Sequence, residues 1–118
     1  MSTPIPTFRI KHVGINNPND AAAEVMLETL SKTFDLPRAN ETDSHIFAGS
    51  LFEVMKNTRY GEYGHVALQT EDVEAAIAYF AEKGIGIQED TIRRDDQGHI
   101  IFAYLQLEIG GFAFHLTK

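Results

Sequence analysis

The feature that most constrains the fold is a short stretch that occurs twice. Residues 10–17 read IKHVGINN and residues 63–70 read YGHVALQT, so a histidine, His12 or His65, precedes an alternation of small and branched residues in each. Alternation with a period of two predicts a strand whose faces differ. The histidine and the small or polar residues share one face, and the branched apolar residues share the other. We therefore predict a core face and a cavity face on each strand.

An amphipathic helix is expected after each of these strands. For the first helix we predict Asn17 as the side-chain cap and Pro18 as the first helical residue; for the second we predict Thr70 as the cap and Gly84 as the stop. Apolar residues at helical spacing predict the buried stripes. These residues are Ala22, Val25, Met26, Leu30 and Phe34 in the first helix, and Val73, Ala76, Ile77, Phe80 and Ala81 in the second.

A strand pair closes each half of the chain. Residues 45–55 turn at Gly49 and Ser50, and residues 99–116 turn at Gly110 and Gly111. Module one therefore spans about residues 8–56 and module two about residues 64–117, and together they fill one domain, residues 1–118. Because 118 residues are too few for two independent domains, we expect the modules to share a core. The fold class is α+β.

Composition limits the possible partners. A formal charge of −7 argues against nucleic acid and anionic membranes, so a small molecule or a protein is expected. No apolar run approaches the roughly 18 residues that span a bilayer, and residues 1–6 lack a signal-peptide pattern, which predicts a cytoplasmic protein. The chain has no cysteine, so any metal must be bound by nitrogen and oxygen.

Four strand residues carry the chemistry. Glu53 follows the turn glycine Gly49 at the same distance at which His115 follows Gly111, so the two are equivalent in the repeat, as His12 and His65 are. All four lie on faces opposite the apolar ones, and an approximate twofold axis between the modules would bring them together. Three imidazoles and a carboxylate suit zinc, nickel, cobalt, manganese or iron(II). We predict one divalent ion bound by these residues.

Each of these side chains also has a simpler interpretation. A single strand histidine is more often an ordinary hydrogen-bonded residue than a ligand, and only the set of four favours metal binding. His45 and His99 have no repeat equivalent and are expected to be ordinary surface or edge residues. Three loop cations, Arg59, Arg93 and Arg94, are most simply solvated charges, although they could bind a substrate carboxylate or phosphate.

The motifs KHVGI (11–15), LFEVM (51–55), YGHVAL (63–68) and GGFAFHL (110–116) resemble the vicinal oxygen chelate superfamily, the glyoxalase I, bleomycin-resistance and extradiol-dioxygenase group. The resemblance covers nearly the whole chain and implies paired βαβββ modules that form a half-barrel with a cleft. It places the glyoxalase I metal ligands on His12, Glu53, His65 and His115. Glyoxalase I has a glutamate at the last of these positions, so Glu53 is left as the catalytic base.

A narrower resemblance is to the glyoxalase-like domain attached to some bacterial keto-hydroxyglutarate and keto-deoxy-phosphogluconate aldolases. It implies a metal-dependent lyase or isomerase acting on a small oxygen-chelating substrate, such as a 2-oxo acid or hydroxy ketone. One alternative is a non-catalytic module that binds a metabolite for an aldolase partner. A weaker one is a drug-sequestering resistance protein. A homodimer is expected, because the cavity face of a half-barrel needs covering.

Overall fold

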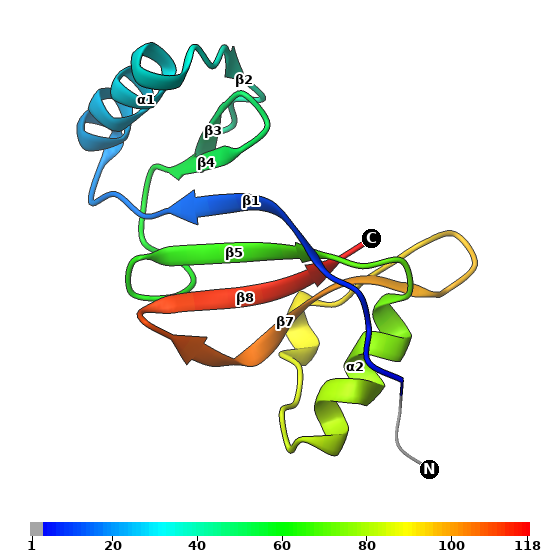
Figure 1. The fold of residues 1–118 in the computed structure, drawn as a ribbon. Helices are drawn as coiled ribbons and strands as arrows, with labels where there is room; N and C mark the ends of the chain where they lie inside the picture. The colour runs from blue at the N-terminus through cyan, green and yellow to red at the C-terminus, as the bar shows by residue number, and fades with distance from the viewer. Residues whose placement is uncertain (1–3) are drawn as a thin grey trace.

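The computed structural model describes residues 4–118, which form one eight-stranded sheet and two α-helices (Figure 1). The expectation that residues 1–6 lack a signal-peptide pattern concerns partly residues 1–3, which lie outside the described residues. The elements in chain order are β1 (Arg9–Ile15), α1 (Asp20–Phe34), β2 (Arg38–Ala39), β3 (His45–Ala48), β4 (Phe52–Met55), β5 (Gly64–Gln69), α2 (Val73–Glu82), the 3-10 helix η1 (Glu89–Thr91), β6 (Arg93–Arg94), β7 (Ile100–Ile109) and β8 (Phe112–Thr117).

The sheet is built from two copies of one βαβββ arrangement. Its strand order is β2-β3-β4-β1-β5-β8-β7-β6. In each half the last strand pairs in parallel with the first, β4 with β1 and β8 with β5. The halves then join through the antiparallel pair β1 and β5. This pseudo-twofold order is the predicted α+β fold, and the prediction is confirmed.

Each half has its own hydrophobic cluster. Ala23 and Leu27 of α1 pack on Ile46, Ala48 and Val54 of β3 and β4. The second cluster joins α2 to β7 and β8 and contains Val73, Ala76, Leu105 and Leu116. Figure 1 shows the two helices at opposite ends of the sheet, with β1 and β5 between them. The predicted shared core is therefore wrong, because the halves share a sheet and have separate cores.

Both helices begin two residues later than predicted. Asn19 caps α1 by accepting a hydrogen bond from the Ala22 amide, and Asp72 caps α2 in the same way from Ala75. The Asn17 side chain is instead buried and donates to the Met55 carbonyl at 3.0 Å. Thr70 lies before α2, and its amide donates to the carbonyl of Thr117, the last residue of β8.

The buried stripe of α1 is rotated from the predicted one: Met26 and Leu30 pack against the first cluster as predicted, but the most buried residues are not among those predicted. Ala23 and Leu27 are buried, whereas Val25 is 67% exposed and Phe34 57% exposed. Val25 therefore faces solvent, although it matches the helical period. In α2 the predicted stripe holds for Val73, Ala76, Ile77 and Phe80, and only Ala81 is exposed. Within residues 4–118, no helix combines the length and apolar character needed to cross a membrane.

Candidate metal centre

Each of the four central strands of the sheet contributes one predicted ligand to a common cavity. His12 comes from β1, Glu53 from β4, His65 from β5 and His115 from β8. The cavity has a volume of about 470 Å³. The structure thus brings all four predicted residues together within a single chain.

Two small residues make room for these four side chains. Gly14 pairs with Glu53 on one side and with His65 on the other. Ala67, its equivalent in the second half, pairs with His12 and His115. Because these residues carry at most one side-chain carbon, the flanking side chains can lean toward one another across them. The repeat therefore provides both the ligand-type residues and the space between them.

The polar atoms of the cluster lie close together. Oε1 of Glu53 is 2.8 Å from Nε2 of His65 and 3.4 Å from Nε2 of His12. The two Nε2 atoms are 3.4 Å apart. One nitrogen from each of His12, His65 and His115 can be chosen so that all three lie within 4.8 Å of one another. A single ion is small enough to contact all three.

The helices lie against the two ends of the other face of the sheet. Phe52 and Val54, on either side of Glu53, pack in the α1 cluster. Phe114 and Leu116, on either side of His115, pack in the α2 cluster. Since neighbouring strand residues point to opposite faces, Glu53 and His115 point away from both helices. The cavity is therefore open to ligands on the face that the helices leave free.

Burial and hydrogen bonding set the charges in the cluster. Burial alone raises the pKa of Glu53, but hydrogen bonds from His12 and His65 outweigh it and hold this pKa well below its usual range. Burial, reinforced by the nearby charges of His65 and His12, lowers the pKa of His115 to about 3. At neutral pH the carboxylate is therefore ionised and the His115 imidazole is neutral, the forms that bind metals.

The structure corrects the prediction for His45. Its Nδ1 lies 3.0 Å from Oε2 of Glu53, and its side chain is only 22% exposed. Phe47 pairs directly with Glu53, so period-two alternation places His45 on the same face. That pairing was the signal that the sequence prediction overlooked. His99 lies outside the cavity, where its Nδ1 is 3.1 Å from Oε1 of Glu74.

An aromatic wall beside His115 was also missed. The rings of Phe102 and Tyr104 have their centroids 4.4 Å and 5.0 Å from that of His115. Tyr104 pairs with His115 in the sheet as Phe47 pairs with Glu53, so the repeat could have indicated it. Burial, followed by the nearby charge of Glu53, raises the pKa of Tyr104. Its hydroxyl therefore stays protonated and can donate a hydrogen bond.

The donor set fits a divalent metal ion. Within residues 4–118, Nδ1 of His115 is buried without a hydrogen-bond partner. A buried polar atom without a partner lowers the stability of the fold, so a bound group near His115 is expected to compensate for it. Three imidazoles and one carboxylate supply nitrogen and oxygen donors, which suit zinc, nickel, cobalt, manganese and iron(II) better than magnesium or calcium. The residues His12, Glu53, His65 and His115 are thus chemically able to hold such an ion.

The paired βαβββ modules and the cavity between their central strands define a class of fold, the glyoxalase-like fold. The particular structures that share it include several methylmalonyl-CoA epimerases. One is a variant of the Streptomyces coelicolor enzyme in complex with 2-nitronate-propionyl-CoA, with a TM-score of 0.56 and 22% identity over 95% of this chain and 94% of that one.

Two further structures are similar. A methylmalonyl-CoA epimerase in complex with methylmalonyl-CoA and NH4+ has a TM-score of 0.56 and 21% identity over 92% of each chain. A hypothetical protein from Bacillus halodurans C-125 has a TM-score of 0.63 and 16% identity over 94% of each chain. No protein-family model and no curated protein matches the sequence. At these identities the similarity establishes the shared fold.

Proposed function

We propose that this protein is a divalent-metal-dependent enzyme that moves a proton on a small substrate with two neighbouring oxygen atoms. A 2-oxo acid or an α-hydroxy ketone has the required oxygens, and the reaction is of the isomerase or lyase type. The observation that carries the proposal is that ring nitrogens of His12, His65 and His115 lie within 4.8 Å of one another, while His12 and His65 also contact the carboxylate of Glu53. Repeat-equivalent strands deliver these groups to a cavity large enough for such a molecule.

In this proposal His12, Glu53, His65 and His115 hold the ion. When bound, the ion acts as a Lewis acid that stabilises negative charge on substrate oxygens. Zinc, nickel, cobalt, manganese and iron(II) all fit these donors. In this proposal the aromatic wall of Phe102 and Tyr104 limits the access of water to the end of the cavity beside His115.

Glu53 is the proposed base. Its carboxylate lines the cavity, is ionised at neutral pH and contacts His12 and His65 through Oε1. His45 contacts the second carboxylate oxygen, Oε2, and so orients the group. The protonated hydroxyl of Tyr104 is a donor that can hold a substrate oxygen. In this proposal Glu53 accepts a proton from substrate carbon and returns it, which is the task of a general base.

The fold neighbours support a proton-transfer reaction. An epimerase inverts a carbon centre, and inversion next to a carbonyl group requires removal and return of a proton. Two of the similar structures are methylmalonyl-CoA epimerases with acyl-CoA compounds bound. The chemistry that we propose for this chain is of the same kind, on a substrate whose oxygens reach the His–Glu cluster.

Hydrogen exchange tests the proposal without knowledge of the product. Nickel- or cobalt-loaded protein is incubated in D2O with a panel of 2-oxo acids and hydroxy ketones, and loss of the proton next to the carbonyl is followed by NMR. We expect exchange that requires the protein and falls at least about 100-fold in Glu53→Gln, because a positioned base contributes that much. Metal content is measured in the same samples, and His99→Gln serves as the control.

Two outcomes would contradict parts of the proposal. A Glu53→Gln protein that retains its ion and exchanges as fast as the wild type would show that Glu53 is not the base. Absence of protein-dependent exchange with every compound in the panel would reject the enzyme. The non-catalytic binding module, with or without an aldolase partner, would then be the better account of the site.

A further inference from the structure

Three cations line the cavity beside the His–Glu cluster. They are Lys11, Arg59 and Arg93. Within residues 4–118 none of the three forms an ion pair, although the chain carries 17 acidic residues against 10 basic ones. Two other cations of the chain are paired: Arg38 with Glu24 and Glu41, and Lys56 with Glu41. Arg9, Lys32, Lys83, Arg94 and Lys118 also form no ion pair in this part of the chain, but none of them lines the cavity, so the cavity stands out by bringing three such cations together.

Aromatic rings connect both arginines to His115. The guanidinium of Arg93 lies 4.6 Å from the centroid of the Phe102 ring, which in turn lies 4.4 Å from the His115 ring. On the other side, Arg59 lies over Tyr60 at 5.5 Å, and Tyr60 stacks on Tyr104 at 4.0 Å. Such contacts leave the guanidinium edges free to donate hydrogen bonds. Both arginines are therefore held near the candidate metal centre.

Local structure fixes the positions of these cations. Lys11 is the extra residue of a β-bulge, because the register between β1 and β5 shifts between Ile10 and His12. A bulge re-aims a side chain, and here Lys11 lines the same cavity as His12 although the two are adjacent in sequence. The loop that carries Arg59 is fixed by Asn16, whose Nδ2 donates to the Gly61 carbonyl at 3.1 Å.

From this arrangement we infer that Lys11, Arg59 and Arg93 form an anion subsite, and that the substrate carries a carboxylate or phosphate group remote from the oxygens directed at the His–Glu cluster. The inference rests on the proposed function for the role of that cluster. Guanidinium and ammonium groups without internal partners recognise these anions through charge-assisted hydrogen bonds. Asp90 also lines the cavity but makes no ion pair with the three cations in the described chain.

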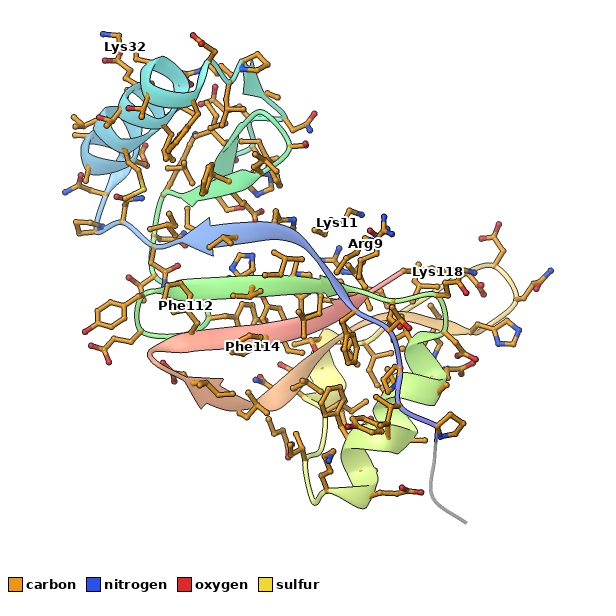
Figure 2. All side chains as sticks on the ribbon, viewed as in Figure 1. Arg9, Lys11, Lys32, Phe112, Phe114 and Lys118 are labelled. Carbon is orange, nitrogen blue, oxygen red and sulfur yellow. The ribbon has the colours of Figure 1, made fainter. Side chains whose placement is uncertain are left out.

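Matched control residues lie close by in the sequence. Arg94 is adjacent to Arg93 but does not line the cavity, and its Nη1 donates to the Gly98 carbonyl at 2.8 Å. Figure 2 shows Lys11 on β1 and Lys32 at the far end of α1, so Lys32 is the control for Lys11. All of these residues are exposed, which makes conservative substitutions compatible with folding.

The first experiment uses metal-free protein, so its result does not depend on the metal. Inorganic phosphate and succinate are titrated at about pH 8, where ordinary imidazoles are neutral, and amide NMR shifts are followed. We expect saturable shifts around Arg59 and Arg93, with affinity reduced about tenfold in Arg93→Gln, Arg59→Gln and Lys11→Met. Arg94→Gln and Lys32→Met should bind as the wild type does. The anion with the higher affinity identifies the group, carboxylate or phosphate.

The second experiment uses metal-loaded protein. 2-Oxoglutarate and 2-oxobutyrate share the 2-oxo acid group, but only 2-oxoglutarate has a remote carboxylate. We expect 2-oxoglutarate to bind about tenfold more tightly than 2-oxobutyrate, and this difference in affinity should be lost in Arg93→Gln and kept in Arg94→Gln. Metal-free protein without saturable shifts, or equal losses in Arg93→Gln and Arg94→Gln, would overturn the subsite. Failure of metal loading alone would reject the proposed function and leave the first experiment decisive for the subsite.

Discussion

At the scale of single residues, Gly14 controls the position of the His65 imidazole. It pairs with His65 across the sheet, and a methyl group added at Gly14 would overlap the His65 ring. Gly14 is also paired with β4 on its other side, so the sheet holds its backbone and the His65 ring would have to move. The absence of a side chain at this position is thus part of the site, as much as the ligand-type residues are.

We predict that Gly14→Ala displaces the His65 ring. The variant should lose about 1–3 kcal/mol of unfolding free energy, as overpacking of a filled space usually does, and should bind nickel or cobalt at least about tenfold more weakly. Gly86→Ala is the control, because a methyl group there meets only the flexible end of Gln106. Calorimetry would measure both quantities, and unchanged metal affinity in Gly14→Ala would contradict the role given to Gly14.

The buried histidine His115 predicts how the stability of the metal-free protein depends on pH. Its pKa is about 3 in the folded state against an ordinary value of 6.5, so between these values the unfolded chain binds a proton that the folded chain does not. Folding stability is therefore full above about pH 6.5 and is lost progressively as the pH falls toward 3. The lowered pKa of Glu53 acts in the same direction at more acidic pH.

We expect the metal-free protein to lose roughly 1–2 kcal/mol of unfolding free energy through His115 between about pH 7.5 and pH 5. Urea unfolding at both pH values measures the loss. In His115→Phe the loss should be smaller, since no imidazole is then buried. An identical loss in wild type and variant would show that His115 is not kept neutral by the fold.

At the scale of the elements, the sequence predicted the strands and their faces better than the helices. Period-two alternation depends only on which side chains are apolar, so it identified the face that carries Glu53 and His115. The helix starts depend on long-range contacts, such as the hydrogen bond from Asn17 to Met55, which no local pattern contains. His45 was missed because it has no repeat equivalent, although the expected pairing of β3 with β4 places it on the face of Glu53.

The rotated stripe of α1 leads to a prediction about stability. Leu27 is 2% exposed in the first cluster, whereas Val25 is 67% exposed. We expect Leu27→Ala to lower the unfolding free energy by about 2–5 kcal/mol, because it leaves a cavity, and Val25→Ser to change it by less than about 0.5 kcal/mol. Denaturant titrations of both variants would measure this. Similar losses of unfolding free energy in both variants would favour the stripe predicted from the sequence, in which Val25 is buried.

At the scale of the whole molecule, the helix side of the sheet is covered only at its ends. A row of apolar residues, Phe52, Val13, Val66 and Phe114, crosses the four central strands in register and is only partly buried. Figure 1 shows α1 and α2 on either side of this region, and the described chain extends over 49 × 25 × 24 Å. A second copy of the chain could cover the row.

The homodimer remains our prediction, with the contact now placed on this row of the helix side instead of on the cavity face. Sedimentation of the wild type at micromolar concentration should give twice the mass of the 118-residue chain, because apolar strips of this kind favour association. Val66→Glu would add a charge to the middle of the row and should shift the equilibrium toward the monomer. A wild type that sediments as a monomer at these concentrations would contradict the prediction.

The central claim, that His12, Glu53, His65 and His115 form a metal centre, is tested most directly by elemental analysis of protein purified without added metal. We predict one divalent ion per chain in the wild type and in His99→Ala, whose imidazole is 62% exposed and lies outside the cavity. His65→Ala, folded according to circular dichroism, should lose nearly all of its metal. A wild type that retains no ion even after incubation with nickel, cobalt or zinc, or equal losses in the two variants, would contradict the account.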